Sequence, residues 1–170
     1  IKSIQELRGK KVGILPGIQW RTIAKIVLAQ NNLDSDKDVT IVELAPSLQA
    51  QALASGQVDA LIAIEPMLTI VKGKDIGKEL LHGMTNQFIS NPFYGGGGIV
   101  NVDFAKNNPN TTAKVLSIFD RAVKEIQENP STVNQYLKGY TPLDSAENLI
   151  PEAPILKFRM YNNLADSELA

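Results

Sequence analysis

Apolar and polar residues in the first part of the chain alternate between two kinds of segment. Short apolar runs at residues 10–15, 38–44 and 58–64 predict three buried strands. Segments with apolar residues three and four positions apart predict amphipathic helices over residues 19–33, 47–55 and 67–73. Strands that alternate with helices of this length are typical of a mainly parallel sheet with helices on its faces. We therefore expect an α/β unit.

The pattern changes at four consecutive glycines, Gly95 to Gly98. Residues 98–105 predict one more strand, and residues 108–130 predict a long helix. The apolar residues of that helix form one stripe, made of Val115, Ile118, Phe119, Ala122, Val123 and Ile126. A shorter helix is predicted from Pro130 to Gly139.

These elements divide the chain into two parts. Residues 1–98 are expected to form the compact α/β unit, and residues 99–170 a mostly helical part that begins with the predicted strand. The chain starts at Ile1 rather than at methionine, so we expect a processed or truncated part of a longer protein. It contains no apolar run of the ~20 residues that a membrane-spanning helix needs.

Composition narrows the classes of function. A net charge of -1 gives no field that would attract nucleic acid. The absence of cysteine removes thiol catalysis, zinc clusters and disulfides. The single histidine, His82, is interpreted as a surface residue, and no Gly-x-Ser-x-Gly motif is present. We expect no enzymatic activity, no catalytic residue, no metal site and no cofactor.

The four glycines require a reason, because glycine loses more backbone entropy on ordering than any other residue. A phosphate-binding loop would lead into a helix and carry a lysine, whereas these glycines lead into a predicted strand without one. A slack linker and a hinge that brings bare backbone close to a ligand are both left open.

The turn after the first strand is the most informative segment for binding. Gly17 permits a tight turn, and Ile18, Gln19, Trp20 and Arg21 then occupy the start of a helix, whose free N–H groups suit an anion. Arg21 adds a forked donor and Trp20 an aromatic surface. Alternatively, Trp20 belongs to the core and Arg21 is a solvated charge.

Each of the three predicted strands is followed by proline or glycine and a helix start on the same edge of the sheet, where open α/β sheets bind ligands. Glu65 is interpreted as the single acid at the carboxyl end of a strand. It either faces a ligand or, before Pro66, favours the start of the next helix. Trp20 with Glu65 would suit an aromatic or cationic molecule, whereas Arg21 with the helix starts favours an anion. We lean towards the anion.

Three segments, at residues 3–17, 39–66 and 99–130, together carry a family resemblance. They include the phrases LRGKKVG, ALASGQVDA with EP soon after, and NVDFAKNNP. In this order they resemble the substrate-binding proteins of ABC importers in the nitrate, sulfonate, taurine and thiamine-precursor group. The resemblance extends from residue 3 to about residue 140.

The resemblance implies a fold of two α/β lobes that close on a ligand. This chain would carry one lobe of periplasmic-binding-protein type II, with a mixed, mainly parallel sheet and flanking helices, and a helical tail that belongs to the other lobe. The N-terminal part of that other lobe is missing. An apolar stripe on the tail, with Val115, Phe119 and Val123, then predicts a partner protein, a second copy of the chain or the missing part of the same protein.

The resemblance also implies the ligand-facing residues, the partners and the location. The partners are a small molecule and a membrane permease, and the location is periplasmic or otherwise extracytoplasmic, a lipid-anchored form included. The glycines would lie at the hinge. The alternatives are the effector-binding domain of a transcription regulator, and a pyrimidine-precursor-binding protein or enzyme on the same fold. The implied ligand contacts are Gly17, Ile18, Gln19, Trp20, Glu65, Pro66, Tyr94, Gly95 and Gly96.

Overall fold

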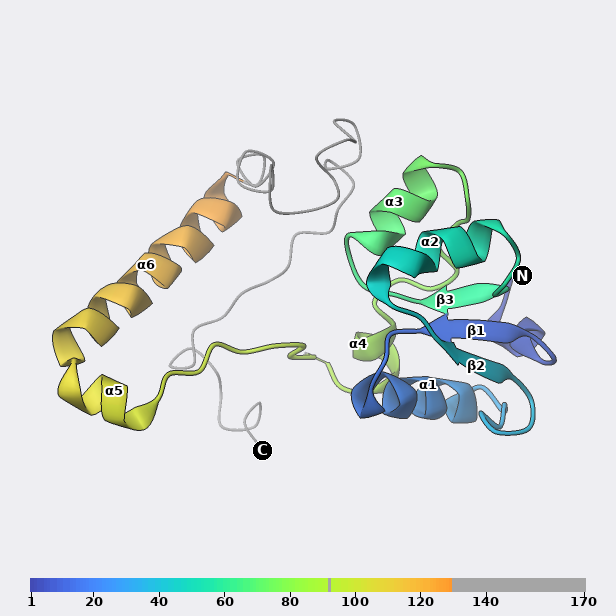
Figure 1. The fold of residues 1–170 in the computed structure, drawn as a ribbon, viewed down its shortest axis with the longest axis horizontal. Helices are drawn as coiled ribbons and strands as arrows, with labels where there is room; N and C mark the ends of the chain where they lie inside the picture. Colours follow the sequence, from blue (N-terminus) through green and yellow to red (C-terminus); the bar gives the residue numbers. More distant parts are fainter. Residues whose placement is uncertain (92, 130–170) are drawn as a thin grey trace. The chain divides into compact units, whose positions relative to one another are not determined.

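A computed structural model describes residues 1–91 and 93–129 (Figure 1). Within the described residues there are two compact units, residues 1–93 and residues 94–129. The sequence pattern alone had suggested a boundary at residue 98. Each unit is described by itself below.

The first unit contains the strands and helices that the apolar pattern predicts. In chain order its elements are the 3-10 helix η1 (Ile4–Leu7), β1 (Lys11–Ile14), α1 (Ile18–Gln30), β2 (Thr40–Glu43), α2 (Pro46–Ala54), β3 (Ala60–Ile62), α3 (Met67–Gly73) and α4 (Met84–Phe88). The three predicted strands and three predicted helices are confirmed. The short helix α4 was not predicted.

The three strands form one parallel sheet in the order β2-β1-β3. Ile14, the last residue of β1, pairs with Glu43 of β2 and with Ile62 of β3. All three strands therefore end at the same edge, which we call the carboxyl edge. The helices α1, α2 and α3 begin there, directly after the strands (Figure 1).

Apolar side chains fill both faces of this sheet. Val12 and Ile14 pack with Ala24 and Leu28 of α1 on one face. On the other face, Leu44, Ala52 and Val58 form a second cluster beneath α2. The α1 helix thus covers one face and α2, with α3 beside it, covers the other (Figure 1). This burial holds the carboxyl edge in place.

Gly13 lies in the middle of the central strand, between the buried residues Val12 and Ile14. A Cβ atom at this position would lie 2.6 Å from Leu61 Cδ2 and 2.9 Å from Leu44 Cδ1. The leucines of the α2 face therefore occupy the space that a side chain would need. At Gly13 it is therefore packing that favours glycine, because a Cβ atom would force these leucine side chains to shift.

The second unit contains two helices within the described residues, α5 (Val102–Asn107) and α6 (Pro109–Glu128). The strand predicted at residues 98–105 is wrong: residues 94–100 form no regular element and α5 begins at Val102. The physical reason is a helix cap, because the Asn101 side chain accepts a hydrogen bond from Phe104 N at 3.0 Å. This local bond favours helix over the β-propensity of the apolar run.

The long helix predicted for the second half is confirmed as α6. Four of its large apolar side chains are exposed, with 44% of Val115, 50% of Leu116, 55% of Ile118 and 62% of Phe119 accessible to solvent, while Val123 and Ile126 are partly buried. The helix predicted at residues 130–139 lies outside the described residues. In the described part of the chain, no helix combines the length and apolar character needed to cross a membrane.

Candidate functional site

The start of α1 brings together five of the residues singled out from the sequence. Gly17 has φ 113°, a conformation that side chains rarely adopt, and its turn takes the chain from β1 into the helix. Ile18 follows as the first helical residue and is 80% exposed. The Gln19 side chain is also exposed. An apolar and a polar side chain thus face solvent at this corner of the carboxyl edge.

A carboxylate that sequence reasoning missed lies at the same corner. Glu43 Oε1 accepts a hydrogen bond from Arg21 Nε at 2.7 Å and another from Gly17 N at 3.3 Å. The register explains the contact, because Glu43 pairs with Ile14 and so ends beside the turn that leads to Gly17. Glu43 was detectable as the acid before Leu44 in the second apolar run. The interpretation of Glu65 as the single acid at a strand end is wrong.

The ion pair shifts the pKa of both side chains. Arg21 holds the pKa of the Glu43 carboxyl below its usual value through the hydrogen bond, and the bond from Gly17 N acts in the same direction. The pKa of Arg21 is raised by the same bond. Since 61% of the Arg21 side chain is exposed, the pair contributes little to stability. The pair matters because Glu43 accepts hydrogen bonds from Gly17 N and Arg21 Nε, the two donors at the start of α1.

Trp20 packs against the core cluster on the α1 face of the sheet, where it is partly buried. This is the contact of a core residue, one of the two roles left open by the sequence. Its ring is therefore fixed by the core rather than held in solvent.

Glu65 and Pro66 follow β3 at the carboxyl edge, and both are partly buried. Glu65 Oε2 accepts a hydrogen bond from Thr69 N at 3.2 Å, in the first turn of α3. The carboxylate therefore serves the start of α3. Its role as a ligand contact stays a prediction.

Tyr94, Gly95 and Gly96 belong to the second unit, in the segment without regular structure. Tyr94 is 43% exposed. A Cβ atom at Gly96, Gly97 or Gly98 would meet no atom within 4 Å, and none of the three has a left-handed φ. Neither space nor backbone conformation requires glycine at these positions in this structure, so the hinge stays a prediction.

Exposed apolar residues also occur after each strand of the carboxyl edge. Besides Ile18 after β1, Leu48 in the first turn of α2 is 51% exposed and Ile64 after β3 is 51% exposed. The edge therefore offers three apolar side chains together with the Arg21–Glu43 ion pair. An organic molecule with both apolar and polar parts matches this composition.

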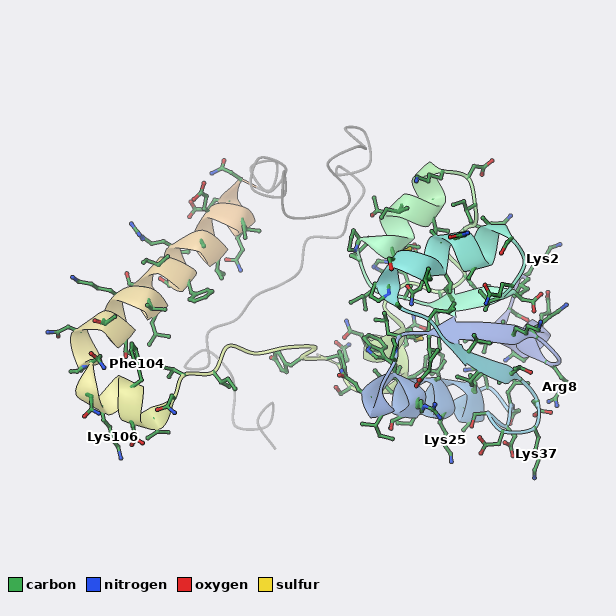
Figure 2. The ribbon with its side chains drawn as sticks, in the orientation of Figure 1. Lys2, Arg8, Lys25, Lys37, Phe104 and Lys106 are labelled. Carbon is green, nitrogen blue, oxygen red and sulfur yellow. The ribbon has the colours of Figure 1, made fainter. Side chains whose placement is uncertain are left out.

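A shallow surface groove of about 410 Å³ lies elsewhere, along the outer side of β2 and α1. Figure 2 shows Lys25, one of its lining residues, projecting from α1 into solvent. The groove shares only Arg21 with the carboxyl edge. Among the described residues, no three histidine, aspartate or glutamate side chains are grouped as metal ligands. The groove is lined by Arg21, Lys25, Ser35, Asp36, Val39, Thr40 and Ile41.

Comparison with known proteins identifies the family. Residues 1–133 match the family described as NMT1/THI5 like. The chain belongs to this family. A Bacillus subtilis (strain 168) protein, provisionally named an aliphatic sulfonates-binding protein, is 30% identical over 123 residues, which are 72% of this chain and 36% of that protein. A provisionally named binding protein of Brucella abortus (strain 2308) is 24% identical over 152 residues, 89% of this chain and 47% of its own length.

Two solved structures share the fold. The alkanesulfonate-binding protein SsuA from Xanthomonas axonopodis pv. citri, bound to MOPS, matches with a TM-score of 0.67 at 19% identity, over 92% of this chain and 53% of that one. A periplasmic sulfonate-binding protein SsuA from Methylobacillus flagellatus KT, provisionally assigned to a sulfonate ABC transporter, matches with a TM-score of 0.65 at 26% identity. That match covers 88% of this chain and 44% of the other. The chain spans about half the length of these relatives or less.

Proposed function

We propose that the chain is part of the solute-binding component of an ABC importer, which captures a small polar or anionic organic molecule for a membrane permease. The observation that carries the proposal is the family match over residues 1–133. The relatives named above are binding proteins, and we extend this role, without enzymatic activity, to the present chain. The rest of the other lobe of the binding component would be formed by residues outside this chain.

The carboxyl edge is the proposed ligand face. Its exposed apolar residues and the polar groups after β1 and β3 support this placement, since open α/β sheets bind ligands beyond the carboxyl ends of their strands. Ligand binding would shift a population of open forms to closed ones. The proposed contacts are Gly17, Ile18, Gln19, Trp20, Arg21, Glu65, Pro66, Tyr94, Gly95 and Gly96.

Isothermal titration calorimetry on the longest protein that contains this chain tests the solute-binding role. The panel comprises alkanesulfonates, taurine, nitrate, a dicarboxylate and a pyrimidine. We expect one class to bind, with Ile18→Asp weakening it at least about tenfold. Glu6→Gln, a change far from the carboxyl edge, is the control. A pyrimidine as the sole ligand would contradict the expected preference for an anion, and the absence of binding to every member of the panel would contradict the function.

The glycine run is proposed as the hinge of closure. Gly97→Val narrows the backbone conformations at this position, and we expect it to weaken ligand binding while leaving the unfolding of residues 1–90 unchanged. Urea unfolding followed by Trp20 fluorescence measures the second quantity in the same sample. Equal binding by the variant and the parent would contradict the hinge.

The exposed stripe of α6 is proposed to mediate self-association of this 170-residue chain. An exposed apolar surface around Phe119 supports the proposal, because such surfaces mark interaction sites. Light scattering at about 100 μM is expected to show a species larger than the 18.5 kDa monomer, and Phe119→Glu to reduce it. A monodisperse monomer of the unaltered chain would contradict the proposal.

The location proposed for the protein is periplasmic or otherwise extracytoplasmic, with or without a lipid anchor. The support is the relative described as a periplasmic sulfonate-binding protein. Fractionation of the source cells, with a detergent step to reveal an anchored pool, tests this location. Recovery of the protein in the cytosol would contradict it.

A further inference from the structure

The start of α1 has the features of an anion-binding corner, but a group of the protein itself already occupies it. Two donors converge there, the backbone N–H of Gly17 and the guanidinium of Arg21. Both donate to one oxygen, Oε1 of Glu43, at 3.3 and 2.7 Å. A ligand anion at this corner would compete with a carboxylate that is covalently tied to the neighbouring strand.

We propose that Glu43 is a specificity-determining residue, whose carboxylate occupies the donors at the start of α1 and keeps anionic groups of ligands away from them. The inference rests on the proposed solute-binding role and concerns which ligand chemistry this corner accepts. A neutral or cationic polar group would be tolerated beside Glu43, whereas a sulfonate or carboxylate would meet a like charge. An acidic ligand would then place its anion away from α1.

The geometry favours Glu43 over a dissolved anion as the acceptor for these two donors. Its backbone is held in register with β1, since Glu43 pairs with Ile14 in the parallel ladder. The carboxylate therefore reaches the two donors without the translational entropy that a dissolved ligand loses on binding.

The start of α3 also has a carboxylate beside it, although there the contact is local in sequence. Glu65, which follows β3, accepts a hydrogen bond from Thr69 N in the first turn of that helix. Two of the three helix starts at the carboxyl edge thus have a carboxylate beside them, Glu43 from the neighbouring strand β2 at α1 and Glu65 from the segment after β3 at α3. At both helix starts, a carboxylate of the protein itself lies where the positive end of the helix dipole would otherwise attract a bound anion.

Glutamine at position 43 provides the test, because Glu43→Gln keeps the size of the side chain and removes its charge. Glu6→Gln makes the same change of net charge in η1, where Glu6 accepts a local bond from Lys2 N. The probes are inorganic sulfate and methanesulfonate, with dimethyl sulfone as the neutral analogue. The backbone amide signal of Gly17 in a proton–nitrogen NMR spectrum of the 170-residue chain reports on the corner. Sodium chloride is exchanged for the two anions at constant ionic strength, and dimethyl sulfone is added to the unchanged salt, which removes general screening effects.

We expect the Gly17 signal of the unaltered chain and of Glu43→Gln to differ in their response to anions. In Glu43→Gln it should shift saturably with both anions, with an apparent affinity at least about tenfold higher than in the unaltered chain and in Glu6→Gln. Dimethyl sulfone should affect the three proteins equally. Equal anion responses in the three proteins would overturn the inference, and so would the absence of any response in Glu43→Gln.

The outcome is separable from that of the proposed function. Calorimetric binding of a solute by the unaltered protein tests the function, whereas the difference between Glu43→Gln and Glu6→Gln tests Glu43. A protein that binds alkanesulfonates through the Gly17 amide without any change in Glu43→Gln would retain its function and contradict the inference. If the unaltered protein binds no solute, but the Gly17 amide responds to anions in Glu43→Gln, the proposed function is contradicted and the inference about Glu43 is supported.

Discussion

Replacing Gln49 by methionine is expected to stabilise the first unit. Gln49 lies on α2 and only 1% of its surface is accessible. Its Nε2 atom has no hydrogen-bond partner among the described residues. The unfolded chain hydrates this amide, so folding removes water from a donor without replacing the lost bond. Methionine has a similar length and no polar hydrogen, and its helix propensity is close to that of glutamine.

The magnitude follows from the cost of a buried, unpaired donor. That cost is about 1–3 kcal/mol, and the burial of a more apolar side chain adds to the gain. The thioether differs in shape from the amide, and repacking around a side chain of similar volume costs less than about 1.5 kcal/mol of stability. We therefore expect Gln49→Met to raise the free energy of unfolding by about 1 kcal/mol, which is roughly 4–8 °C in melting temperature for a unit of this size.

Urea unfolding is the appropriate assay, because the only tryptophan, Trp20, packs against the core of the same unit. Gln51→Met is the matched control, since Gln51 lies on the same helix with its side chain exposed. The control is expected to stay within about 0.5 kcal/mol of the unaltered chain. A loss of more than about 1 kcal/mol in Gln49→Met would refute the reasoning, as it would show that the Gln49 amide is paired in solution.

Three further predictions concern packing, capping and pH. Gly13→Ala should destabilise the first unit by about 1–3 kcal/mol in urea, because its Cβ overlaps the leucines above it, whereas Gly96→Ala, in open space, should have little effect. Asn101→Ala should weaken α5 by about 1 kcal/mol, measured as reduced helical carbon chemical shifts at residues 102–107, and unchanged shifts would contradict the cap. The pKa values of Asp34 and Glu43 are both lowered, Asp34 chiefly by the backbone bond from Asp36, so their stabilisation is present above pH ~4 and lost as pH falls further. The double variant Asp34→Asn, Glu43→Gln should therefore show a flatter acid decline in stability, and an equal slope would contradict this assignment.

The sequence predicts the first unit well because its apolar pattern is consistent with its final packing. Val12 and Ile14 face α1, and Leu61 faces the other layer, as alternation along parallel strands requires. The same kind of pattern gives a wrong prediction at residues 98–105, where the apolar residues do not form a strand. The difference is a single local bond from Phe104 N to Asn101, which periodicity does not contain. The short α4 was missed because five residues carry too little periodic signal.

The candidate site was predicted less completely, because its decisive contact is not local. Arg21 and Glu43 are 22 residues apart, and only the strand register brings them together. Composition at the first turn correctly indicated donors for an anion, with Arg21 among them. It could not show that Glu43 of the neighbouring strand would be that anion.

The charges at the carboxyl edge bear on how a solute would be selected there. Where helix starts are empty, their partial positive charge dominates, and an anion is the natural ligand. Here Glu43 and Glu65 accept bonds at the starts of α1 and α3, so the electrostatic attraction is met within the protein. The exposed side chains of Ile18, Leu48 and Ile64 then gain relative importance, because burying them on a ligand is favourable at any charge. Selection at this edge would depend on the apolar part of the solute, and the placement of any acidic group would be set by residues other than those at the start of α1.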